Sequence, residues 1–208
     1  VVLLDANGDS LAENRATIGS FAGCLPRTMK HLLAIFPLDS WVQGDVVISN
    51  DPWMGTGHRP DVTVVAPIFY GNTIIGFTGN TGHWADIGGA IFSADTKSVF
   101  EEGIGLPPMK IVNEGIPDAT LVNLIKSNVR VPDMVIGDLF AQIATAEICS
   151  DLVVDFVNQS GLEDLSILSI AIMERAENAM RSAIGVVPDG TYRSTVPLDG
   201  YDDPLYLQ

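Results

Sequence analysis

Basic residues are scarce in this 208-residue sequence, which has 11 Lys and Arg against 26 Asp and Glu and a formal net charge of -15. A charge of this sign repels nucleic-acid phosphates and anionic lipid headgroups, so we expect no nucleic-acid partner. No apolar run approaches the ~20 residues that cross a bilayer, and no basic segment followed by an apolar one opens the chain. The sequence therefore predicts a soluble protein with no membrane partner.

Cysteine is almost absent too. Cys24 and Cys149 lie far apart, and no C-x-x-C pair occurs. This spacing suggests neither a disulfide framework nor a thiolate zinc site, and it is typical of a cytoplasmic protein. The glycine-rich phosphate loop GxxxxGK[ST] is also missing, so this chain is not expected to bind ATP by itself.

Apolar residues make up 47% of the sequence, which is enough to bury a substantial core. The chain begins inside an apolar run, followed by Asn7-Gly8, which is a strong signal for a hairpin turn. Near its end, the stretch from Pro188 to Tyr192 turns toward what looks like a new strand. We therefore interpret the chain as a piece of a longer subunit.

Strand patterns come first along the chain and helical patterns follow. The expected strands are 46–49, 62–70 and 72–79, and the expected helices are 27–36, 118–128, 138–158 and 163–184. Residues 80–118, rich in Gly and Pro, are expected to form a long functional loop. This order predicts an α+β fold with a mixed or antiparallel sheet, a metal-site loop region and then long helices.

The same patterns suggest a division of the chain into three parts. Residues 1–130 are expected to form a strand-rich core with metal-site loops, 131–187 a helical segment of the same domain, and 188–208 the start of a further strand region.

Two His-x-x-Asp pairs flank the central pair of strands. His58 and Asp61 precede the first strand, whereas His83 and Asp86 follow the second. Because hairpin strands run antiparallel, the entry of one and the exit of the other are neighbours, and all four side chains should converge. A nitrogen and oxygen ligand set without thiolates suits a divalent ion such as Zn, Mn or Fe at an open site.

Asp51 is a fifth candidate, either as a ligand or as a carboxylate that orients a histidine. A second interpretation is that these residues have only structural roles and bind no metal. Asp and Asn before Pro or Gly commonly form turns, and a His in a loop usually makes an ordinary hydrogen bond.

Several longer motifs resemble the hydantoinase B/oxoprolinase family, and they run in unbroken order through nearly all of the chain. They are Gly44-Asp45-Val46, Asn50-Asp51-Pro52, Gly57 to Thr63, His83 to Gly89, Glu102-Gly103, Leu106 to Lys110, Asn128-Val129-Arg130 with Pro132, Gly137-Asp138-Leu139 with Ala141-Gln142, and Pro188 to Tyr192.

The resemblance implies a subunit of an ATP-dependent enzyme that opens cyclic amides such as hydantoins, 5-oxoproline and lactams. It implies a hetero-oligomer in which ATP is bound by a hydantoinase A-type subunit, which activates the substrate. The component that resembles this chain would hold a divalent metal through His58, Asp61, His83 and Asp86, with Asp51 as the catalytic base.

Two other functions stay open. Relatives of the family carboxylate ketones such as acetone and acetophenone, and Trp84, which stands where many members have a second His, resembles that branch. Another departure is Thr17-Ile18 before Gly19-Ser20, where members often have a His.

The third interpretation is a non-catalytic assembly subunit whose helices between 138 and 184 dock a partner, through apolar residues such as Leu139, Ile143, Ile148, Leu152 and Val153.

Overall fold

The computed structural model describes residues 1–14, 18, 21, 23–90, 93, 95–198 and 205–207. The departure from the family pattern at Thr17 and Gly19-Ser20 lies outside these residues. The chain divides into two compact units, residues 1–170 and 171–208, and each is described by itself. In the part of the chain that the structure describes, no helix combines the length and the apolar character needed to cross a membrane.

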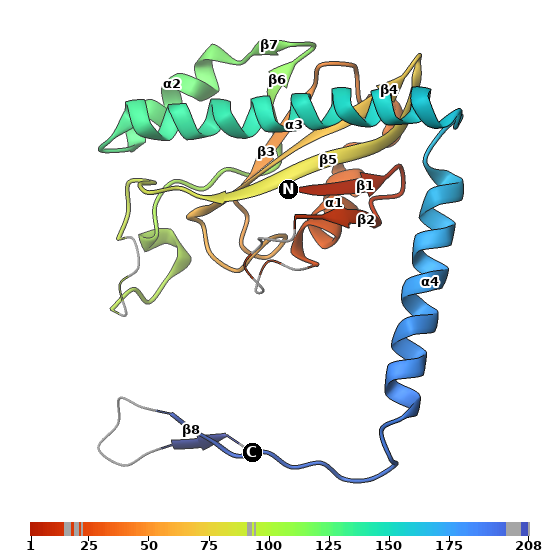
Figure 1. The fold of residues 1–208 in the computed structure, drawn as a ribbon. Coiled ribbons are helices and arrows are strands. Elements are labelled where there is room, and N and C mark those ends of the chain that lie inside the picture. The colour runs from red at the N-terminus through yellow and green to blue at the C-terminus, as the bar shows by residue number, and fades with distance from the viewer. Residues whose placement is uncertain are drawn as a thin grey trace. The chain divides into compact units, whose positions relative to one another are not determined.

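The first unit is built on a seven-stranded sheet with the order β2-β1-β5-β4-β3-β6-β7, in which every neighbouring pair is antiparallel (Figure 1). Its strands are β1 (Val2–Asp5), β2 (Ser10–Glu13), β3 (Val46–Ser49), β4 (Asp61–Tyr70), β5 (Thr73–His83), β6 (Met109–Asn113) and β7 (Ile116–Pro117). The longest strands, β4 and β5, form a hairpin in the middle of the sheet.

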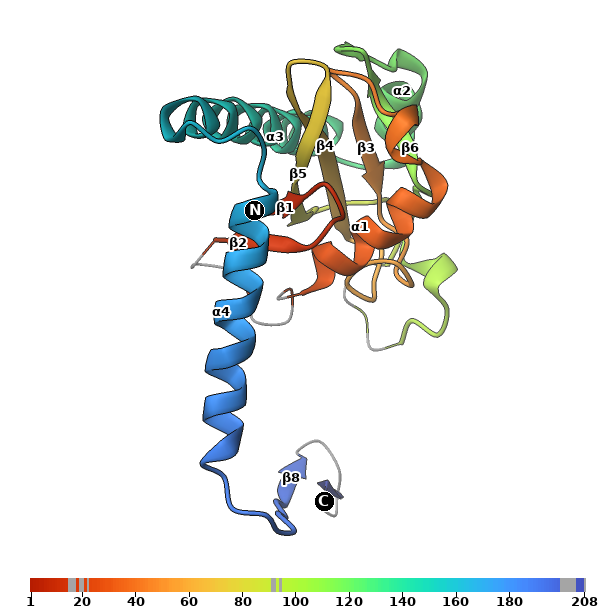
Figure 2. The same cartoon turned by 90° about the vertical axis from the view of Figure 1, so that its right-hand side faces the viewer.

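Helices cover both faces of this sheet. Among the described residues the helices are α1 (Cys24–Ile35), α2 (Ala119–Asn128), α3 (Pro132–Ser160) and α4 (Ser166–Gly185), with short 3-10 turns η2 (Leu38–Ser40) and η3 (Val99–Glu101). The long helix α3 lies along β4 and β5 on one face, and α1 lies on the opposite face (Figures 1 and 2). Helix α4 begins in the first unit and continues into the second.

Side chains of β4 point alternately to the two faces of the sheet, so this strand contributes to two hydrophobic cores. Val62 and Val64 are fully buried in the core under α3, whereas Val65 is buried in the core under α1. Because successive side chains of a strand point to opposite faces, an almost continuous apolar run is what a strand covered on both faces requires. On the α3 side the same core receives Leu139 and Ile143, which are one helical turn apart.

The expected α+β class is confirmed, with an all-antiparallel main sheet. The expectation that 80–118 lacks regular structure was wrong in part, because β5 extends to His83 and β6 lies within that range. Strand β6 pairs with β3, which is about 60 residues earlier in the sequence, and local periodicity carries no sign of such a partner. Helix α3 also begins earlier than residue 138, at Pro132, a residue well suited to the first helical turn.

The second unit holds the rest of α4 and a small antiparallel pair, β8 (Val196–Leu198) with β9 (Leu205–Leu207). The strand expected after Pro188 therefore begins at Val196.

Candidate metal centre

The hairpin of β4 and β5 brings the two expected pairs of residues to one end of the sheet. Asp61 is the first residue of β4 and His83 is the last residue of β5, and the two form a register pair across the strands. His58 precedes Asp61 by three residues in the loop from β3. Antiparallel pairing therefore brings Asp61 and His83 together, and His58 meets Asp61 because it lies three residues earlier in the chain.

The Asp61 carboxylate lies between two imidazoles. Nε2 of His58 is 2.8 Å from Oδ2 of Asp61, and Nδ1 of His83 is 2.8 Å from Oδ1 of the same residue. The two imidazole centroids are 5.3 Å apart. The carboxylate side chain is only 1% exposed, whereas the His58 and His83 side chains are 31% and 34% exposed. A carboxylate buried to this degree needs polar partners on both oxygens, and the two histidines supply them.

These three residues also fit a divalent ion. One ligand atom from each of His58, Asp61 and His83 lies within 4.8 Å of the other two. Two donors that each bind an ion at ~2.1 Å are at most about 4.2 Å apart, slightly less than this limit, so the three side chains would have to adjust to share one ion. Two nitrogens and one oxygen match Zn, Mn or Fe, and three protein ligands leave a coordination position open.

Asp86 does not join this cluster, although the sequence placed it there. Its Oδ1 accepts hydrogen bonds from Nη2 and Nε of Arg130 at 2.7 and 3.0 Å, and from the backbone N–H of Gly88 at 3.0 Å. Its Oδ2 accepts from the backbone N–H groups of Arg130 and Val131. Burial alone raises the pKa of Asp86, but Arg130 and these backbone donors outweigh it and lower the pKa to about 2.

Asp86 thereby fastens the loop after β5 to the junction of α2 and α3. Gly88, with φ +87°, lies against the carbonyl oxygen of Asn128 so closely that a Cβ has no room. Arg130 donates a further hydrogen bond to the carbonyl oxygen of Gly89 at 2.9 Å. The signal for this role was present in the sequence as the Asn128-Val129-Arg130 motif, but only the fold shows which carboxylate it meets.

Asp51 caps a turn. Its Oδ1 accepts from the backbone N–H of Trp53 at 2.9 Å, and its carbonyl oxygen accepts from Gly55 at 3.0 Å. This is the structural role that an Asp before Pro commonly has. Asp51 is not part of the three-residue cluster.

Two cavities adjoin the cluster, one beside each histidine. A cavity of about 370 Å³ is bordered by His58 and Glu102 among others. A second, of about 390 Å³, is bordered by His83, Trp84 and Gln142. Asp51 does not line either of them. Glu102 and Gln142 both belong to motifs of the sequence, but only the fold shows that they lie beside the cluster.

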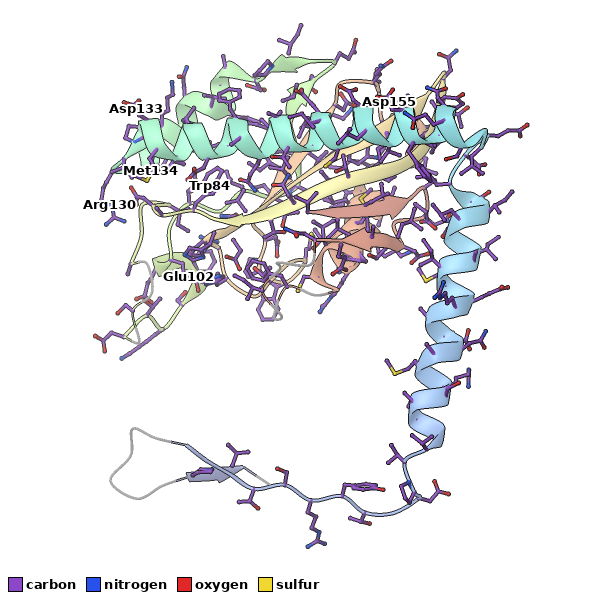
Figure 3. The ribbon with its side chains drawn as sticks, viewed as in Figure 1. Trp84, Glu102, Arg130, Asp133, Met134 and Asp155 are labelled. Carbon is purple, nitrogen blue, oxygen red and sulfur yellow. The ribbon has the colours of Figure 1, made fainter. Side chains whose placement is uncertain are left out.

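Glu102 is held in place by the residue that follows His58. Its Oε2 accepts the backbone N–H of Arg59 at 2.7 Å, while Nη1 of Arg59 donates to the carbonyl oxygen of Gly103 at 2.7 Å. The Glu102 side chain, labelled in Figure 3, comes from the segment just after η3. The structure thus brings a carboxylate from a distant part of the sequence to the cavity beside His58.

Comparisons with known proteins agree on one family. The chain is 34% identical over 211 residues to the B-type subunit of the putative D-/L-hydantoinase of Pseudomonas sp. (strain NS671), a match that covers 97% of this chain and 36% of that protein. It is 28% identical to the acetophenone carboxylase delta subunit of Aromatoleum aromaticum (strain EbN1), over 93% of this chain and 28% of the relative.

Among solved structures, the crystal structure of the ATP-dependent caprolactamase from Pseudomonas jessenii superposes with a TM-score of 0.87 at 27% identity, over 95% of this chain and 34% of that chain. The chain spans about a third of the length of these relatives. The family model described as Hydantoinase B/oxoprolinase matches residues 1–207. The chain therefore belongs to the hydantoinase B/oxoprolinase family.

Proposed function

We propose that this chain is the metal-holding part of an ATP-dependent cyclic-amide hydrolase of the hydantoinase, oxoprolinase or lactamase type. The observation that carries the proposal is the cluster of His58, Asp61 and His83 at one end of the central hairpin. Similarity to a B-type hydantoinase subunit and to an ATP-dependent caprolactamase supports the reaction class. ATP would be bound by a separate hydantoinase A-type subunit in a cytoplasmic hetero-oligomer, since this sequence has no phosphate loop.

The three residues would hold a Zn, Mn or Fe ion. Such an ion supplies Lewis acidity, which polarises a carbonyl group and lowers the pKa of a bound water toward neutrality. Asp61 is the residue that organises the site, because it is in contact with both imidazoles and is almost fully buried. Asp86 would act as a structural anchor in this proposal, since its carboxylate oxygens accept hydrogen bonds from Arg130 and backbone amides.

Acid–base chemistry also needs a carboxylate that faces the substrate. The sequence suggested Asp51, but this side chain caps a turn and does not border either cavity beside the cluster. Glu102 shares the cavity of about 370 Å³ with His58. We therefore place Glu102 ahead of Asp51 as the group that takes a proton from the attacking water and returns it to the leaving nitrogen.

A ketone carboxylase is the second candidate, and one feature favours it. Trp84 stands directly after His83, where the family resemblance implies a second His in many members, and the acetophenone carboxylase delta subunit is a relative. In the structure Trp84 is 1% exposed and its indole Nε1 donates to Oε1 of Gln142 at 2.8 Å. Its ring thus packs in the core under α3, a role compatible with either branch.

Turnover by the purified complex decides between the two branches. With ATP present, we expect ring opening of hydantoin, 5-oxoproline or caprolactam by the wild-type complex. His58→Ala should abolish this turnover, whereas His31→Ala, a matched change at an exposed histidine on α1, should leave it unchanged. Turnover only of acetone or acetophenone, and only with bicarbonate, would reject the hydrolase in favour of the carboxylase.

A further inference from the structure

We propose that Gln142 on α3 is a positioning residue for the metal centre: it ties together the two strand ends that carry Asp61 and His83. The inference rests on the proposed metal-binding function and deepens it by assigning a role to a motif residue whose task the sequence left open. The role follows from the contacts of one side-chain amide, the burial of its partners and the place of those partners in the hairpin.

The side chain of Gln142 bonds to both strands at once. Its Nε2 donates to the carbonyl oxygen of Val62 at 2.9 Å, and its Oε1 accepts from the indole Nε1 of Trp84 at 2.8 Å. Val62 directly follows Asp61 on β4, and Trp84 directly follows His83 at the end of β5. One amide therefore contacts the residue next to each of two cluster members.

The position of this contact along the hairpin gives it importance. Asp61 and His83 form the last register pair of β4 and β5. Beyond it, the N–H of Trp84 donates to the carbonyl oxygen of Pro60 at 2.8 Å. The ends of paired strands open more readily than their middles, because fewer neighbouring contacts hold them. A second attachment from α3 at this point opposes such opening.

Burial strengthens the hydrogen bonds that Gln142 makes to Val62 and Trp84. Val62 is 0% exposed and Trp84 is 1% exposed, so water competes little for their polar groups. Asn80, 6% exposed, donates from Nδ2 to the backbone carbonyl oxygen of Gln142 at 2.9 Å and so fixes this turn of α3 to β5 as well. Figure 3 shows Trp84 on the side of α3 that faces the sheet.

A glycine next to these partners leaves space for the Gln142 side chain. Gly82 pairs with Val62 across the hairpin, and a Cβ added at Gly82 would lie 3.1 Å from Nε2 of Gln142. A side chain one position before His83 would therefore push the Gln142 amide away by a few tenths of an ångström, and the glycine leaves room for its present position.

A purely structural role, in which Gln142 only holds α3 on the sheet, makes a different prediction. It would lower thermal stability when removed but would leave the histidines and metal affinity unchanged in the folded protein. The test therefore needs a control that weakens α3 packing far from the cluster. Val157, 0% exposed on the same helix, provides it as Val157→Ala.

The experiment compares Gln142→Met, which has similar length and no hydrogen-bonding amide, with Val157→Ala and the wild type in the full chain. The first readout is affinity for Zn²⁺ and Mn²⁺, titrated at a temperature where each variant is folded. Loss of a residue that orients metal ligands typically weakens binding by about 10–100-fold, and we expect a loss in that range for Gln142→Met and none for Val157→Ala.

The second readout does not depend on a metal. The chain has only three histidines, so ¹⁵N-histidine NMR resolves each ring, with exposed His31 as an internal reference. We expect Gln142→Met to shift the ring signals of His83 while His31 is unchanged. Trp84→Phe, which removes the indole donor and keeps an aromatic ring, should shift the same signals and serves if Gln142→Met does not fold.

The two readouts separate this inference from the proposed function. If the wild type binds no divalent ion but the His83 signals respond to Gln142→Met and not to Val157→Ala, the metal proposal fails, whereas the part of the inference in which Gln142 positions His83 is supported. If Gln142→Met lowers the melting temperature as Val157→Ala does, with unchanged metal affinity and unchanged histidine signals, the positioning role is rejected.

Discussion

At the scale of single residues, the structure separates two aspartates that look equivalent in the sequence. Asp61 and Asp86 each follow a histidine by three positions, but Asp61 contacts two imidazoles and Asp86 contacts a guanidinium. The partner of Asp61 could be predicted because it lies across one hairpin. The partner of Asp86, Arg130, is 44 residues away in the sequence, with β6 and α2 between them.

This difference predicts how Asp86→Asn affects stability. The pKa of Asp86 is lowered from 3.8 to about 2, so the ionised form stabilises the fold by about 2 kcal/mol at neutral pH. The contribution is present above about pH 4 and is lost as the pH falls toward 2. Asp86→Asn should remove it, lowering the free energy of unfolding by about 2 kcal/mol at pH 7 and flattening the acid dependence between these values.

Urea unfolding at several pH values measures both effects. Asp155→Asn, a change at an exposed aspartate in α3, is the matched control and should alter stability by less than about 0.5 kcal/mol. Metal content should be unaffected by Asp86→Asn. A variant that keeps wild-type stability but loses its metal would restore Asp86 as a ligand.

At the scale of elements, the sequence predicted the hairpin and the existence of the helices better than it predicted their ends. The runs of Val, Ile and Phe in β4 and β5 are long and separated by Gly71-Asn72, a clear turn signal. Strand β6 is short and irregularly paired, with a register shift against β3, so nothing local identifies it. Helix α3 was missed over its first six residues because Pro132 was not recognised as a helix start.

The packing of α3 gives a prediction at this scale. Leu139 is 0% exposed in the core under the helix, whereas Leu152 on the same helix is 62% exposed. Leu139→Ala should lower the free energy of unfolding by about 3 kcal/mol, because it removes a buried side chain and leaves a cavity. Leu152→Ala, the identical substitution, should change it by less than about 0.5 kcal/mol. Equal losses for the two variants in chemical denaturation would show that α3 does not pack as described.

At the scale of the whole molecule, the exposed apolar residues of α3 bear on the assembly interpretation. Of the residues named for docking, Leu139 and Ile143 are buried against the sheet, whereas Ile148 and Leu152 are 60% and 62% exposed. Apolar side chains exposed along one helix are consistent with a partner surface. Such a surface and a metal centre are compatible, because the cluster lies at the end of the hairpin beside the first half of α3, whereas Ile148 and Leu152 lie further along the helix. Two relatives of the chain are themselves named as subunits.

The central claim is that His58, Asp61 and His83 hold one divalent ion. Elemental analysis of the intact, natively assembled protein tests it most directly, with His31→Ala as the matched control. We predict about one equivalent of Zn, Mn or Fe per chain in the wild type and in His31→Ala, and less than about a tenth of this in Asp61→Asn and in the His58→Ala/His83→Ala double variant. Full metal content in the double variant, or no stoichiometric divalent ion in the wild type, would contradict the account.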